Sequence, residues 1–130
     1  MTIGELAAVT GVSVRSLRYY ERQGLIMPLR RANGYREYSP LAVETVESIK
    51  LYLNLGLTTE EIAGFLHCVL KNKEAFCAEV MPLYESKLAH IERQIQELNQ
   101  LKENLRQRME AIRQEQGQVE GQEQGMFQGQ

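Results

Sequence analysis

Hydrophobic residues recur at intervals of seven in the C-terminal half of the chain, and this repeat limits the possible folds more than any other feature. The apolar positions are Tyr84, Ile91, Leu98, Leu105 and Ile112 in one series and Leu88, Ile95 and Met109 in an interleaved one. Only Lys102 interrupts the second series, and charged residues and glutamines surround both. This pattern predicts a coiled coil. Because one helix cannot bury such a stripe alone, we expect these eight residues to form a homodimer interface.

The rest of the sequence is divided around this long helix. A chain of 130 residues has room for one compact domain and an extension. We predict a compact domain over residues 1–70, the coiled-coil dimerisation helix over residues 71–115 and a disordered tail over residues 116–130, where Gln and Gly predominate. Pro82 should lie in the first turn of the long helix or kink it. The predicted fold class is mainly α.

Two short helices separated by a tight turn are predicted at the N-terminus. Thr2 and Glu5 have the spacing of a capping box, and Gly11 ends the first helix. Ser13 is a suitable N-cap for the second helix, which Gly24 ends. A pair of short helices joined by a turn with glycine is typical of a helix-turn-helix.

A small β-hairpin is predicted over residues 29–38. Asn33 and Gly34 form a favourable two-residue hairpin turn, since both residue types tolerate a positive φ. Ser39 and Pro40 then mark the start of a helix that continues to about Asn54. A further capping box, Thr58 with Glu61, opens a helix that contains Phe65 and Leu66. A hairpin after two short helices completes a winged helix-turn-helix.

The charges predict that the N-terminal part binds DNA. Residues 1–38 contain six arginines against three glutamates, a net charge of +3, whereas the remaining residues carry a net charge of −5. Arginine is the side chain best suited to phosphates and guanine edges. The second helix of a helix-turn-helix enters the major groove of DNA. The predicted DNA-binding residues lie on this helix or the wing: Ser13, Arg15, Ser16, Arg18, Tyr19, Arg22, Arg30, Arg31, Tyr35 and Arg36.

The runs SVRSLRYYERQGLI, NGYREYSP and LGLTTEEI resemble the MerR family of bacterial transcription regulators. The resemblance covers nearly everything except the tail. It implies a winged-helix domain and an antiparallel coiled-coil dimer that binds double-stranded promoter DNA. It also implies activation by bending and untwisting the DNA, which realigns the promoter for RNA polymerase without direct contact. Within this resemblance, Arg15, Arg18 and Tyr19 would be recognition-helix contacts, and Tyr35 and Arg36 wing contacts.

The effector is open, and Cys68 and Cys77 are the residues that bear on it. Metal-sensing regulators of this family keep a cysteine where Cys77 lies, but their later ligands have no counterpart after His90. We therefore predict no metal site and no resident cofactor. Apart from a metal ion, the effector could be an oxidant or electrophile that reacts with a thiol. In that case we expect Cys77 to be the more reactive residue and Cys68 to be buried. The third alternative is that both cysteines only pack.

Two other function classes fit the sequence less well. A coiled-coil adaptor could use its winged helix to bind a protein, but the arginine excess favours DNA. A thiol enzyme lacks a base, because no histidine is suitably paired with a cysteine and the chain contains no Asp. We thus expect no enzymatic activity. The sequence has no secretion signal and no apolar run long enough to span a membrane, which predicts a cytoplasmic protein with free thiols.

Overall fold

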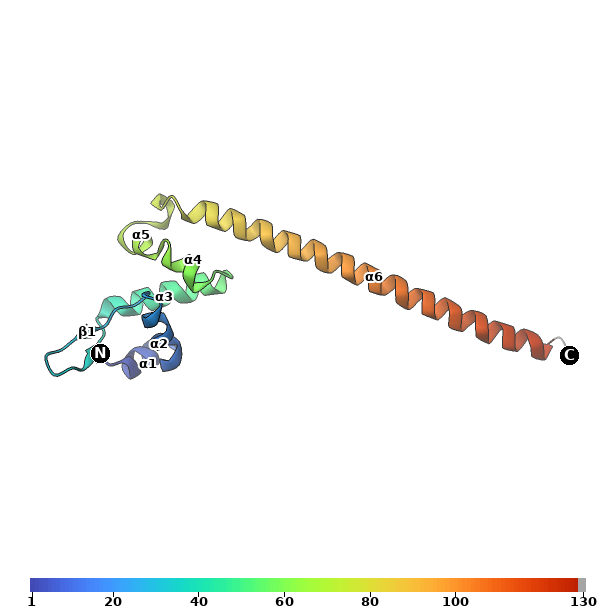
Figure 1. Ribbon diagram of the computed structural model, residues 1–130, viewed down its shortest axis with the longest axis horizontal. Coiled ribbons are helices and arrows are strands. Elements are labelled where there is room, and N and C mark those ends of the chain that lie inside the picture. The colour runs from blue at the N-terminus through green and yellow to red at the C-terminus, as the bar shows by residue number, and fades with distance from the viewer. Residues whose placement is uncertain (129–130) are drawn as a thin grey trace. The chain divides into compact units, whose positions relative to one another are not determined.

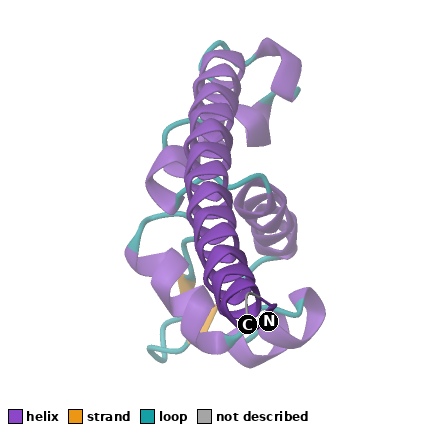
Figure 2. Ribbon diagram, turned by 90° about the vertical axis from the view of Figure 1, so that its right-hand side faces the viewer, coloured by secondary structure: helices purple, strands orange, loops and turns teal. Residues whose placement is uncertain are grey.

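The computed structural model describes residues 1–128, and the side chains of residues 1–119. Helices dominate it, and only two short strands are present in the described part (Figure 2). Two compact units are separated along the chain, Met1–Lys87 and Leu88–Gln130. The first therefore extends well past the predicted boundary at residue 70, because the start of the long helix packs on the N-terminal core.

The first two helices begin and end as their capping residues predict. Helix α1 spans Ile3–Thr10, with the Thr2 hydroxyl accepting the Glu5 amide at 3.1 Å and Gly11 at a left-handed φ of 74°. Helix α2 spans Val14–Arg22 and is capped by Ser13. The two helices pack on each other and α1 packs on α3, so the predicted helix-turn-helix is present (Figure 1).

The wing is a two-stranded antiparallel sheet whose turn differs from the predicted one. Strand β1 (Leu29–Arg30) pairs with β2 (Arg36–Glu37). The Gly34 amide donates to the Arg31 carbonyl at 2.9 Å, so the turn is centred on Ala32 and Asn33. Within this loop, Gly34 alone has a positive φ, 83°. The three-residue loop thus takes a turn followed by a left-handed glycine, and the predicted two-residue turn was wrong.

Helix α3, Pro40–Asn54, supplies the centre of the hydrophobic core. Its Val46, Ile49 and Tyr52 are buried, and α1 and α4 pack against it. The rings of Tyr52 and Phe65 meet edge to face with centroids 4.8 Å apart, a favourable geometry for aromatic pairs. Pro40 occupies the first turn of α3, as predicted, where its missing N–H removes no hydrogen bond.

The segment after α3 contains two short helices where one was predicted. Helix α4 spans Thr59–Ala63 and has both halves of the Thr58–Glu61 capping box. Helix α5 spans Leu66–Lys71, and a 3-10 turn, η1, spans Glu74–Phe76. The break falls at Gly64 and Phe65, because Phe65 turns into the core beneath Tyr52.

Helix α6 is continuous from Val80 to Gln128 (Figure 1). Pro82 lies in its first turn, as predicted. The disorder predicted from residue 116 is not observed up to Gln128, and residues 129–130 lie outside the described residues. Two features of the sequence favour the longer helix: Gln and Glu are good helix formers, and Val119 continues the seven-residue series seven positions after Ile112.

Candidate nucleic-acid interface

Helix α2 presents a cationic face to solvent. Arg15, Arg18, Tyr19 and Arg22 are all exposed, while Leu17 on the opposite face is fully buried. The Tyr19 hydroxyl lies 3.4 Å from the Thr59 hydroxyl oxygen of α4, which helps to fix the ring. The spacing of three or four residues therefore places these side chains on one side of the helix, as the sequence predicted.

The N-terminus of α2 is held by two serines. The Ser13 hydroxyl accepts the Ser16 amide at 3.1 Å and donates to the Ser16 hydroxyl oxygen at 3.0 Å. These bonds satisfy the helix end. Both residues lie at the end of the helix that carries partial positive charge, which favours nearby phosphate. Ser13 is exposed and Ser16 is half-buried.

The wing is held against α2 by a carboxylate, Glu21, that no sequence pattern indicates. The Arg36 guanidinium donates to the Glu21 carboxylate at 3.0 Å, and the Tyr38 hydroxyl donates to the same oxygen at 3.3 Å. Burial and the Glu21 charge raise the pKa of the Tyr38 phenol. Glu21 thus holds β2 beside the recognition helix. No local pattern reveals this role, since Glu21 and Arg36 are fifteen residues apart.

A second ion pair lies within the wing itself. Arg31 forms two hydrogen bonds to the Glu37 carboxylate, and this pairing lowers the pKa of Glu37. The N-terminal ammonium of Met1 lies 3.7 Å from the same carboxylate and donates to the Tyr38 carbonyl at 2.9 Å. Tyr35, at the tip, is 74% exposed and free to contact a partner.

These contacts separate the predicted DNA-binding arginines into two groups. Among the described residues, Arg31 and Arg36 form ion pairs, whereas Arg15, Arg18, Arg22 and Arg30 form none. Four exposed guanidinium groups in each protomer therefore keep their full capacity for an anionic ligand. Arg18, Arg22 and Arg36 also line one shallow pocket with Glu21, so the paired and unpaired arginines meet where α2 adjoins the wing.

The two cysteines are joined as a disulfide, which corrects the prediction of free thiols. Their Cα atoms lie 6.0 Å apart, within the usual range for a disulfide. Their burial also reverses the prediction, because Cys77 is 4% exposed and Cys68 is partly exposed. In α5, Leu66 faces the core and is buried. Cys68 comes two residues later and so lies on another side of the helix, where it is partly exposed. Cys77 packs with Val80 against the core.

The start of α6 is attached to the rest of the first unit by two further contacts. The Lys87 ammonium lies 2.9 Å from the Glu61 carboxylate of α4, and this bond lowers the pKa of Glu61. The Tyr84 hydroxyl donates to the Glu74 carboxylate at 2.6 Å, and burial together with Glu74 raises the pKa of Tyr84. Tyr84 therefore packs against the core of its own protomer, and its place in the dimer interface stays a prediction.

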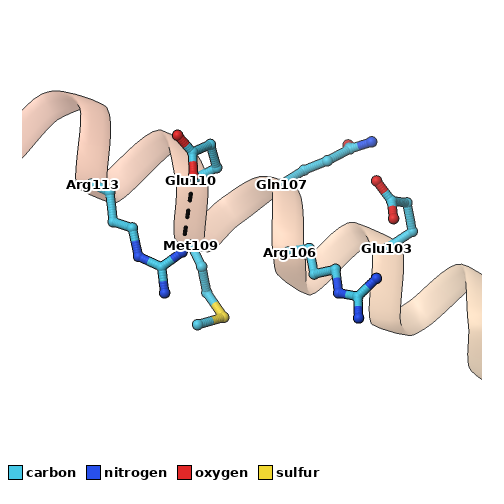
Figure 3. A pocket seen from close by; sticks show the side chains of 6 residues that line it. All are labelled: Glu103, Arg106, Gln107, Met109, Glu110 and Arg113. Atoms are coloured by element: carbon cyan, nitrogen blue, oxygen red, sulfur yellow. Dashed lines mark ion pairs between the residues drawn. The ribbon is translucent and has the colours of Figure 1, made fainter.

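The other seven predicted interface residues are exposed in the isolated chain. Their exposed fractions run from 38% at Ile91 to 65% at Leu105. Leu101 and Val119, which the sequence analysis did not select, are exposed as well. Around Met109, Arg106 and Arg113 point to the same side as the methionine, while Glu103, Gln107 and Glu110 point to the other (Figure 3). The helix thus presents an apolar stripe with charged flanks.

Two negative findings concern the described residues. No group of three or more potential ligands among His, Cys and the carboxylates lies close enough there to hold a metal ion. Nor does any helix in that part of the chain combine the length and apolar character that crossing a membrane requires.

Comparison with known proteins gives one consistent result. Residues 1–67 match the family described as MerR HTH family regulatory protein, and residues 43–108 match MerR, DNA binding. The chain is 39% identical to the mercuric resistance operon regulatory protein of Bacillus cereus, covering 79% of this chain and 78% of that one. It is 35% identical to the HTH-type transcriptional regulator HmrR of Rhizobium leguminosarum bv. viciae, covering 81% of each.

A solved structure agrees with this assignment. The transcription regulator PbrR691 from Ralstonia metallidurans CH34, in complex with lead(II), superimposes with a TM-score of 0.72 at 28% identity and 81% coverage of both chains. The relatives are described as transcriptional regulators, and the second matching family is described by its DNA binding. The basic winged helix and the matching families together show that this chain belongs to the MerR family of DNA-binding transcription regulators.

Proposed function

We propose that a homodimer of this protein binds a roughly palindromic promoter site through α2 and the wing of each protomer. The observation that carries this proposal is the set of exposed arginines that form no ion pair among the described residues, Arg15, Arg18, Arg22 and Arg30. Arg15 and Arg18, near the start of α2, would contact base edges in the major groove. Arg30 and Tyr35 would contact the flanking backbone.

The Glu21–Arg36 ion pair gives the wing a defined position in this scheme. A wing held against α2 contacts the backbone at a fixed distance from the major groove. Two winged helices, one from each protomer and joined through α6, would impose a fixed geometry on the DNA between the half-sites. The regulator would then act by bending and untwisting the promoter, with RNA polymerase responding to the altered DNA. Part of the sequence preference would come from DNA deformability.

The first test measures binding to the promoter of the regulator's own gene against salt concentration. If all four unpaired arginines of each protomer contacted phosphate, the slope of log affinity against log salt would be about −7, and base contacts would make it shallower. DNase footprinting should show protection with two-fold symmetry. A slope near zero, or no protection, would contradict the proposal. A protein-binding adaptor would give both of these results.

We further propose that the effector acts on the pair Cys68 and Cys77 rather than on one reactive thiol. Oxidation by hydrogen peroxide would convert the two thiols into the disulfide, with the peroxide reduced to two molecules of water. The disulfide ties α5 to the residue three positions before α6. The Glu61–Lys87 and Glu74–Tyr84 contacts lie at the same junction. A change there would reach the helix that sets the spacing of the two winged helices.

The accessible thiol should be Cys68. After reduction, we expect a maleimide to label Cys68 several-fold faster than Cys77, because Cys77 is buried with Val80. Mass spectrometry of the native protein measures both rates. Mild peroxide should remove both thiols together without forming covalent dimers, and Cys68→Ser or Cys77→Ser should each abolish this paired loss. Faster labelling of Cys77, or intermolecular disulfides in wild type, would contradict the proposed pair.

A further inference from the structure

A column of charged residues on α6 changes sign at its middle. One apolar series of α6 consists of Tyr84, Ile91, Leu98, Leu105 and Ile112. The residues directly after its members form the column Glu85, Glu92, Asn99, Arg106 and Arg113. All five are exposed. Among the described residues, the two glutamates and Arg106 form no ion pair, and Arg113 has only a 3.9 Å contact with Glu110. The N-terminal half of the column is thus acidic and the C-terminal half basic.

The symmetry of an antiparallel helix pair makes this arrangement self-complementary. When two copies of one helix cross about a two-fold axis, a flanking column of one faces the same column of the other in reverse order. With the axis close to Gln100, Glu92 of each copy faces Arg106 of the other, and Glu85 faces Arg113. Each pair occurs twice, so the dimer gains four attractive pairs.

The apolar stripe fits the same axis. Leu88 would then lie level with Ile112 of the second copy, Ile95 with Leu105, and Ile91 with Met109. Lys102, the one interruption, would lie level with Leu98 and so would avoid another lysine. Each of these hydrophobic residues is at least 38% exposed in the single chain. Pairing would therefore bury the apolar stripe from Leu88 to Ile112.

The axis also accounts for Leu101, which falls outside both apolar series but is 59% exposed. On the second flank of the stripe, the column is Lys87, Gln94, Leu101, Arg108 and Glu115. Crossing near Gln100 brings Leu101 against Leu101 of the second copy. The apolar side chain is thus covered at the centre of the interface. Lys87 is already held by Glu61, so the first flank carries the electrostatic argument.

Other arrangements of the two helices lose these contacts. A parallel, in-register pair would place Lys102 against Lys102 at the centre and Arg108 near Arg113 on the flank, both of them like-charge contacts. Shifting the antiparallel pair by seven residues leaves only one kind of opposite-charge pair, for example Glu92 with Arg113. The sequence therefore favours one orientation and one register over its neighbours.

We propose that the register and the self-recognition of the α6 dimer are set by the charge column Glu85, Glu92, Arg106 and Arg113 about an axis near Gln100. The partner is a second copy of this chain, and the inference rests on the homodimer of the proposed function. It adds which residues face each other and what distinguishes a correct partner from another long helix. In coiled coils, charged flanking positions commonly set partner choice and orientation.

The test mixes two charge-reversed full-length chains. In a homodimer of the Glu92→Arg variant, the new arginine faces Arg106 of the other copy. In a homodimer of the Arg106→Glu variant, the new glutamate faces Glu92 of the other copy. Each variant should dimerise on the order of tenfold more weakly than wild type, since two attractive pairs become repulsive. A mixture of the two should restore wild-type affinity by forming heterodimers, detected with two affinity tags and by sedimentation. Glu97→Arg and Arg93→Glu, outside both flanking columns, are the matched controls.

A second variant tests the axis without altering charge. In a Cys68→Ser, Cys77→Ser background, Leu101→Cys should form a covalent dimer on mild oxidation, whereas Gln94→Cys alone should not. If the wild type is dimeric but the two charge variants show no preference for heterodimers and Leu101→Cys gives no crosslink, the proposed register is wrong although the dimer exists. A monomeric wild type would instead contradict the dimer on which the proposed function depends.

Discussion

Leu105→Glu is expected to dissociate the homodimer and, with it, to abolish specific DNA binding. Leu105 is 65% exposed in the single chain, so its burial depends on a second copy. Burying a leucine contributes about 1.5–3 kcal/mol to the free energy of dimerisation. Because each dimer contains two copies of Leu105, the substitution removes this contribution twice. A buried carboxylate costs more still. The dimer dissociation constant should rise at least about a hundredfold, measured by sedimentation.

The matched control is Gln107→Glu, which adds the same charge two residues away. The Gln107 side chain lies on the opposite side of α6 from Met109 (Figure 3), so this variant should remain dimeric and bind DNA normally. Leu105→Glu should keep the far-ultraviolet circular dichroism of the N-terminal unit, because that unit has its own core. A dimeric Leu105→Glu protein with unchanged affinity would remove the α6 stripe from the assembly.

The helix boundaries that the sequence predicts well are those fixed by local hydrogen bonds. Thr2, Ser13 and Thr58 each accept a backbone N–H at the start of a helix, as their residue types suggest. Pro40 marks the start of α3 equally well. These signals require only three or four neighbouring residues, so no knowledge of tertiary packing is needed. The helix-turn-helix follows from them directly.

The predictions that failed are those that depend on packing between distant residues. Cys77 is buried by Val80 and the core rather than exposed at a helix start. The observed hairpin turn lies one residue before the predicted one, because Ala32 and Asn33 also form a favourable turn when glycine follows.

The shared exposed side of the α2 arginines was predictable from sequence, but the ion pairs beside it were not. Helical periodicity alone places Arg15, Arg18 and Arg22 on one side of α2. Whether an arginine is available for DNA depends on carboxylates brought near by the fold. Glu21 reaches Arg36 only because the wing folds back onto α2, and no spacing rule anticipates that contact.

Replacing Arg15 and Arg18 together with alanine should reduce specific promoter binding by at least about a hundredfold, since one lost base contact alone costs about 1–3 kcal/mol. Both side chains are exposed and form no ion pair among the described residues, so folding should be unaffected. Lys71→Ala with Lys73→Ala removes the same charge from exposed positions outside α2 and serves as the control. Gel shifts on specific and unrelated duplexes, repeated over a salt series, measure the effect.

The same salt series distinguishes the two kinds of contact that these arginines can make. An arginine that contacts a base edge contributes to discrimination between sequences, so its loss weakens promoter binding more than binding to unrelated DNA. An arginine that contacts phosphate affects both duplexes alike, and its loss makes the salt slope shallower by about one for each protomer. We expect the first pattern for Arg15, in the first turn of α2, and for Arg18, at its middle. Unchanged promoter binding by the double variant would show that α2 is not the recognition helix.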